Sequence, residues 1–241
     1  MLGIALPTAA SDARLTSGEL ARAPTVELAD RVLGRDLAAE AVTHLLEDRP
    51  RILDSDRHAH GAIRFFMRPV EVAQGVCRRD TWYVPLKPTP HFDGDGYLAG
   101  DAMGPTPQLA IADDCASAPD LAFGWYPSRR PIGDAVDVLT RVRAFQQRLR
   151  QGEALPFEVE CSSTLPGTDP CEPGAAEVLR SLPLDRLLSV EFDRAIASGT
   201  LGWTLSIGPD GRGRPFFRLM LPERGQEMRV LRLIWMAPLP S

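Results

Sequence analysis

The spacing of its cysteines constrains this chain more than any other feature of the sequence. Cys161 and Cys171 lie ten positions apart and enclose a turn-forming segment, residues 162–170, of Ser, Thr, Leu, Gly, Asp and Pro. A zinc knuckle needs two thiolates roughly two to four residues apart, and a redox dithiol needs a Cys-x-x-Cys motif. Neither spacing is met, so the sequence predicts a Cys161–Cys171 disulfide that stabilises the fold by about 2–3 kcal/mol.

The two remaining cysteines, Cys77 and Cys115, then pair by elimination. Two buried free thiols are the alternative, because a reduced cysteine behaves as a small apolar side chain. Disulfides persist in oxidising compartments. The cysteine pattern therefore predicts a periplasmic or secreted protein.

The first fifteen residues are expected to lie outside the fold. Residues 2–6 are apolar, and the small residues that follow suit cleavage by a signal peptidase. Residues 1–15 therefore resemble the tail of a signal peptide, although a basic segment and most of an apolar segment are missing. A disordered terminus is the alternative interpretation.

Composition narrows the possible partners. The chain of 241 residues has a net charge of −5, with 44% hydrophobic and 24% charged residues, as in an ordinary globular protein. The acidic balance argues against nucleic-acid binding, which needs a basic face, and no apolar run approaches the roughly 20 residues that span a bilayer. Lys87 is the only lysine and asparagine is absent, which indicates a GC-rich bacterial genome.

The hydrophobic pattern predicts one α+β domain over residues 16–241, with a helical section, residues 16–54, that packs on residues 55–241. Thr16 and Glu19 have the spacing of a capping box, and Thr25 or Asp36 can cap the helices that follow. A second helix is expected from one apolar stripe with His44 at its boundary: Leu37, Ala41, Val42, Leu45 and Leu46.

The remaining residues predict an antiparallel sheet packed with a few helices. Strands are expected at residues 62–70, 79–86, 109–113, 121–126 and 157–161, with a long loop at residues 87–108. Apolar residues recur at helical spacing over residues 132–149, and a short helix is expected at residues 173–181. The C-terminal residues predict a meander, with strands at residues 201–207, 214–222 and 227–238. Blocks of helices and strands favour α+β over a doubly wound sheet.

Two stretches could supply a metal site. His58 and His60 share one face of an extended segment, and the loop from His91 adds carboxylates. Together they could hold Zn²⁺ or Ca²⁺ and activate water; the candidate ligands are His58, His60, His91, Asp93 and Asp95, with Asp101 nearby. The alternative is a solvated loop with surface histidines. Stoichiometric metal that is lost when His58 and His60 are mutated would favour the metal site.

Other candidate residues have structural interpretations. Asp113 and Asp114 could act as an acid and base pair, but such pairs more often turn the chain. Glu158 and Glu160 alternate with apolar residues, as in a solvent-facing row. Four aromatic pairs could form ligand platforms, but strand neighbours point to opposite faces, so each pair is expected to give one core residue and one exposed or interface residue. The pairs are Phe65-Phe66, Trp82-Tyr83, Trp125-Tyr126 and Phe216-Phe217.

The sequence carries no nucleophile elbow, no zinc-protease motif and no phosphate-binding loop. It predicts an exported bacterial protein without a cofactor, which binds an envelope protein or a small ligand or takes part in envelope assembly. A metal-dependent hydrolase is the alternative. A structural subunit of a larger assembly is a third interpretation.

Overall fold

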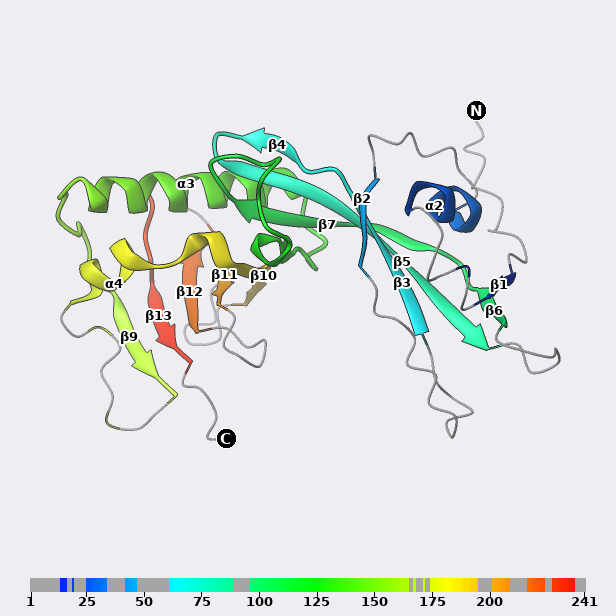
Figure 1. Cartoon of the computed structure of the whole chain (residues 1–241). Coiled ribbons are helices and arrows are strands. Elements are labelled where there is room, and N and C mark those ends of the chain that lie inside the picture. Colours follow the sequence, from blue (N-terminus) through cyan, green and yellow to red (C-terminus); the bar gives the residue numbers. More distant parts are fainter. Residues whose placement is uncertain are drawn as a thin grey trace, which may run out of the picture. The chain divides into compact units, whose positions relative to one another are not determined.

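The computed structural model describes residues 14–16, 19, 25–33, 42–46, 61–88, 96–164, 167, 171, 174–194, 201–208, 216–223 and 227–236 (Figure 1). Residue contacts divide the chain into two compact units. Unit 1 comprises residues 1–68 and 79–106, and unit 2 comprises residues 69–78 and 107–241. The single domain expected over residues 16–241 stays a prediction.

Unit 1 is built from antiparallel strands. Strand β3 (Gly61–Met67) pairs with β2 (Val42–Leu46) and with β5 (Val76–Pro88), while β6 (Gly96–Ala99) pairs with β5 and with β1 (Arg14–Thr16). Helix α2 (Thr25–Leu33) packs Leu28, Ala29 and Val32 into a core with apolar strand residues. Those strand residues are Leu15, Ile63, Phe65, Trp82, Val84 and Leu86.

Unit 2 holds the C-terminal meander and the longest helix. Strands β10 (Leu187–Arg194), β11 (Leu201–Ile207), β12 (Phe217–Pro222) and β13 (Arg232–Trp235) pair in succession and antiparallel. Helix α3 (Ile132–Arg150) buries Ala135, Val138, Leu139, Val142, Phe145 and Leu149 in the same core as these strands. The helix predicted at residues 132–149 is confirmed.

Helix α4 (Ala175–Ser181) confirms the short helix predicted at residues 173–181. It is held against α3 by a buried amide. The Nε2 of Gln146 donates hydrogen bonds to the carbonyl oxygens of Leu179 at 3.1 Å and Leu182 at 2.7 Å. These bonds satisfy carbonyls at the end of α4, which an α-helix leaves without internal partners.

The prediction of a purely antiparallel sheet is wrong, because the sheet is mixed. Strand β9 (Glu160–Ser163) pairs in parallel with β13, and β8 (Gly124–Trp125) pairs in parallel with β10 at Ser189. The α+β character remains. Alternation along a strand indicates which face is buried, but it does not indicate which strand lies beside it or in which direction. The sequence therefore did not predict that β9 pairs with β13.

The prediction of a helical section over residues 16–54 is also wrong. Helix α2 starts at Thr25 as expected, but the stripe that predicted a second helix contains strand β2, whose residues 42–46 pair with β3. A short apolar run fits both the helical and the strand periodicity, and pairing with a neighbouring strand overrides local propensity. Residues 37 and 41 lie outside the described residues.

The capping box at Thr16 and Glu19 is confirmed. The backbone N–H and the hydroxyl of Thr16 donate to Oε2 of Glu19 at 2.8 and 3.1 Å, and the N–H of Glu19 donates to the Thr16 hydroxyl at 3.1 Å. Glu19 also pairs with Arg31 at 2.7 Å. Arg31, and then the bonds from Thr16, lower the pKa of Glu19 to about 2.

The long loop predicted at residues 87–108 contains strand β6 and the first part of β7 (Met103–Ile111) instead, and the rest of β7 falls in the strand predicted at residues 109–113. Pro105 and Pro107 argued against a strand because proline donates no hydrogen bond to a ladder. They lie two positions apart and so face the same edge of β7. Strand β8 pairs on β7 only at Gln108 and Leu109, past both prolines.

Both cysteine pairs form disulfides in unit 2, with Cα–Cα distances of 5.5 Å for Cys77–Cys115 and 6.0 Å for Cys161–Cys171. These distances lie in the normal range for a disulfide. Cys77 is fully buried and Cys115 is nearly so, in a small apolar cluster with Ala110, Ala122 and Phe123. Within the described ranges, no helix has both the length and the apolar character needed to cross a membrane.

Candidate ligand-binding pocket

A pocket in unit 2 brings together side chains from α3 and the segment before it, from β10 and β11, and from the residue that follows β12. It is open to solvent and has a volume of about 320 Å³, at the lower end of the range of small-molecule sites. Eight residues line it: Arg130, Asp134, Asp137, Val138, Arg141, Phe192, Trp203 and Glu223. We call this site the α3 pocket.

The floor of the α3 pocket is an aromatic pair. Phe192 on β10 and Trp203 on β11 are directly opposite in the antiparallel register, so they share one face of the sheet. Their ring centroids are 5.0 Å apart in a T-shaped arrangement. The Tyr126 ring stacks on Trp203, and the two ring centroids are 6.4 Å apart. Trp203 is only 3% exposed and belongs to the core of unit 2.

Arg130 forms one wall of the pocket. Its guanidinium carbon lies 4.0 Å from the centre of the Phe192 ring, in the range of a cation–π contact, and its Nη2 pairs with Glu223. The hydroxyl of Tyr126 donates to the backbone carbonyl of Arg130 at 2.9 Å. The pKa of Tyr126 is raised above its ordinary value, mainly by burial. The phenol therefore stays protonated at neutral pH and can donate this hydrogen bond.

A stripe along α3 also lines the pocket. Asp134, Asp137, Val138 and Arg141 recur at three- and four-residue spacing and therefore lie on one side of the helix. Arg141 Nη2 pairs with Asp137 Oδ2 at 2.9 Å. Asp134 is exposed, and in the part of the chain that the structure describes its carboxylate makes no hydrogen bond or ion pair. The pocket thus contains three carboxylates and two guanidinium groups, both of them already paired.

The residues proposed as metal ligands lie outside the described residues: His58, His60, His91, Asp93 and Asp95. Asp101 is described and exposed. Among the described residues no cluster of three or more His, Cys, Asp or Glu side chains could hold a metal ion. The metal site stays a prediction.

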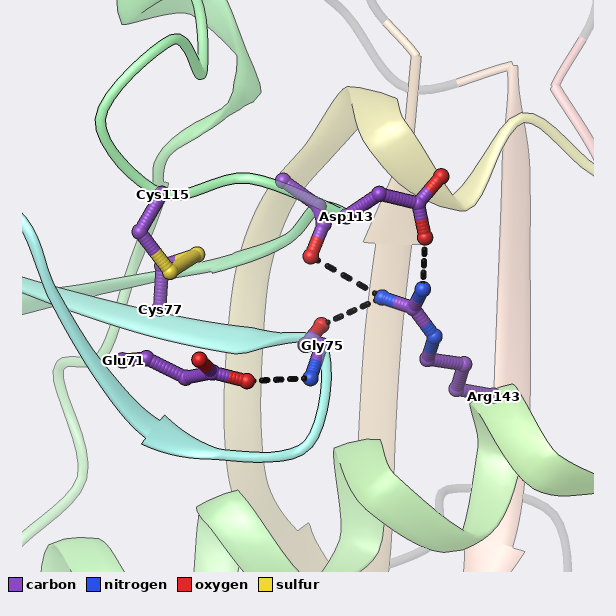
Figure 2. A network of polar contacts seen from close by, with 7 residues as sticks. Glu71, Gly75, Cys77, Asp113, Cys115 and Arg143 are labelled. Carbon is purple, nitrogen blue, oxygen red and sulfur yellow. Dashed lines mark hydrogen bonds and ion pairs between the residues drawn. A yellow bond between two sulfur atoms is a disulfide. The ribbon is translucent and has the colours of Figure 1, made fainter.

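Asp114 has the structural role that was the alternative interpretation, and Asp113 forms an ion pair. Asp114 accepts a hydrogen bond from the N–H of Ala116 at 3.0 Å and so turns the chain before the disulfide. A bond from the Ser117 side chain and then that from Ala116 hold the pKa of Asp114 below its ordinary value. Asp113 pairs with Arg143 (Figure 2).

Arg143 belongs to a polar network that fixes the hairpin between β4 (Val70–Ala73) and β5 (Figure 2). Its Nη1 donates to the carbonyl oxygens of Gly75 at 2.7 Å and Ala112 at 3.0 Å. The N–H of Gly75 donates to Glu71 Oε1 at 3.1 Å. The Arg143 side chain is 16% exposed, and it bonds the turn at Gly75 and the segment after β7 at Ala112 and Asp113, so we assign it a structural role.

The expected split of the aromatic pairs is met at Trp82-Tyr83 and Trp125-Tyr126, where Trp82 and Tyr126 are buried while Tyr83 and Trp125 are exposed. It is wrong at Phe65-Phe66, because both rings are buried; Arg79 covers Phe66, its guanidinium carbon 4.2 Å from the ring centre. At Phe216-Phe217 both residues are half-buried. Glu158 and Glu160 are exposed, as predicted.

The sequence did not indicate the α3 pocket. Its only local signal is the row of charged residues at helical spacing on α3, which is equally typical of a solvated helix face. No protein-family model matches the chain, and neither a curated protein nor a solved structure matches it.

Proposed function

We propose that this is an exported bacterial protein of the periplasm or the extracellular space, and that its role is to bind a ligand or a partner in the cell envelope. The proposal depends chiefly on one observation: all four cysteines are in disulfides. Paired cysteines persist in an oxidising compartment and are rare in the reducing cytosol. The N-terminal resemblance to a signal peptide supports the same location.

The α3 pocket supports a role in binding. It combines an aromatic floor with charged groups from α3, from the segment just before α3 and from the residue after β12, and convergence of a few polar groups on an apolar surface is the common form of a ligand site. Its carboxylates and guanidinium groups are engaged with each other or exposed. This arrangement suits recognition of a charged group better than transfer of a proton or attack on a substrate.

Cell fractionation tests the location. With the protein expressed from its own locus, we expect it in the periplasmic or culture fraction, where non-reducing electrophoresis shows faster migration than reducing electrophoresis, because disulfides keep the denatured chain compact. A cytosolic enzyme serves as the marker for lysis. Recovery of the protein with that marker, with identical migration under both conditions, would contradict export.

A further inference from the structure

The α3 pocket has one charged group that its own residues do not neutralise. Arg130 pairs with Glu223 and Arg141 pairs with Asp137, which leaves the carboxylate of Asp134 as the unmatched charge among the eight lining residues. Asp134 lies in the first turn of α3, where the partial positive charge of the helix, about half a unit, offsets part of its own. The lining still carries a net negative charge.

The pocket also shows which kind of group its floor accepts. The guanidinium of Arg130 lies over the Phe192 ring while it pairs with a carboxylate. A planar cation is therefore already held by an aromatic face and an acidic side chain in this pocket. A ligand cation beside it would meet the unpaired carboxylate of Asp134, which lines the same pocket.

Two other ligand classes fit the pocket less well. An anion would have to compete with Glu223 for Arg130 and with Asp137 for Arg141. A sugar ring needs an open aromatic face to stack on, but Trp203 is 3% exposed and Arg130 covers Phe192. We infer that the α3 pocket binds an organic cation, an ammonium or guanidinium group, with Asp134 as its main partner. This inference rests on the proposed binding function.

Capped amino acids of different charge test the inference directly. N-acetyl-L-arginine amide, N-acetyl-L-glutamine amide and N-acetyl-L-glutamic acid amide differ in the side-chain head group, which is cationic, neutral or anionic at pH 7. We expect isothermal titration calorimetry on the full chain to give at least tenfold tighter binding of the arginine probe than of the glutamine probe. The affinity should fall as salt is raised from 20 to 300 mM. Equal binding of all three probes, or preference for glutamate, would overturn the inference.

Single substitutions locate the site. Asp134→Asn is expected to weaken binding of the arginine probe at least tenfold, because it removes the unmatched carboxylate. Glu158→Gln is the matched control: it removes one exposed carboxylate outside the pocket, so the affinity should not change. Loss of affinity in both variants would show a general charge effect and would contradict a site at Asp134.

A variant with increased affinity guards against misinterpreting a folding defect. Arg141→Gln removes one guanidinium from the lining and frees Asp137 from its ion pair, so binding of the arginine probe should become several-fold tighter. Weaker or unchanged binding in Arg141→Gln would contradict the charge argument. If no probe binds while the disulfides and the exported location are found, the ligand class is wrong and export stands.

Discussion

Replacing Cys77 and Cys115 together by alanine is expected to lower the free energy of unfolding by about 4 kcal/mol. The reason is entropic, because the disulfide joins residues 38 positions apart and so restricts a large loop of the unfolded chain. Urea denaturation followed by far-UV circular dichroism measures the change. Since most domains have only about 5–15 kcal/mol to lose, this variant should be the least stable of those considered.

The matched control is the double variant Cys161→Ala/Cys171→Ala. This disulfide spans only 10 positions, so the same loop argument gives about 3 kcal/mol. Reduction of the native protein should destabilise it by more than either double variant does. A Cys77→Ala/Cys115→Ala variant as stable as the native protein would mean that this bond does not constrain the unfolded chain.

Gly75→Ala is expected to lower the free energy of unfolding by about 3 kcal/mol, as the sum of two costs. Gly75 has φ of +70°, and a side chain in this left-handed region costs about 1–2 kcal/mol. An added Cβ would also lie 1.9 Å from Nη1 of Arg143, so the guanidinium must leave. Loss of its hydrogen bonds to Gly75 and Ala112 costs about 1.5 kcal/mol or more. Chemical denaturation measures the total.

Two comparisons separate these costs. Gly152 also has positive φ, +92°, but an added Cβ meets nothing within 4 Å, so Gly152→Ala should cost only the backbone part, about 1–2 kcal/mol. Arg143→Met removes the guanidinium that an added Cβ at Gly75 would meet. Adding Gly75→Ala to this variant should therefore lower the free energy of unfolding by less than it does in the native protein. Equal costs for Gly75→Ala in the two backgrounds would contradict the clash.

Local periodicity was enough to predict the elements that carry their own signal. Helix α3 shows apolar residues at helical spacing over nineteen residues and was found, as was the capping box at Thr16 and Glu19. Strand β11 alternates large apolar residues with small or polar ones and was found, and β12 was found as an apolar run. In each case the information lies within one segment, so no knowledge of a neighbouring segment is needed.

Features that depend on neighbours were missed. Strand β2 was taken as helix because its pairing with β3 cannot be read from residues 42–46 alone. The prolines of β7 hid its first part, residues 103–108, although a strand was expected from residue 109. The sequence did not indicate that β9 has the parallel neighbour β13. The α3 pocket is the extreme case, since Arg130 and Glu223 form one wall although they are 93 positions apart.

The central claim is that the native protein carries both disulfides, and trapping of thiols tests it most directly. Intact host cells are treated with an alkylating reagent before lysis, and the purified protein is mapped by peptide mass spectrometry with and without reductant. We predict no alkylated cysteine before reduction, linked peptides only for Cys77–Cys115 and Cys161–Cys171, and four reactive thiols after reduction. Alkylation of Cys161 and Cys171 in untreated cells, or any other pairing, would contradict the account.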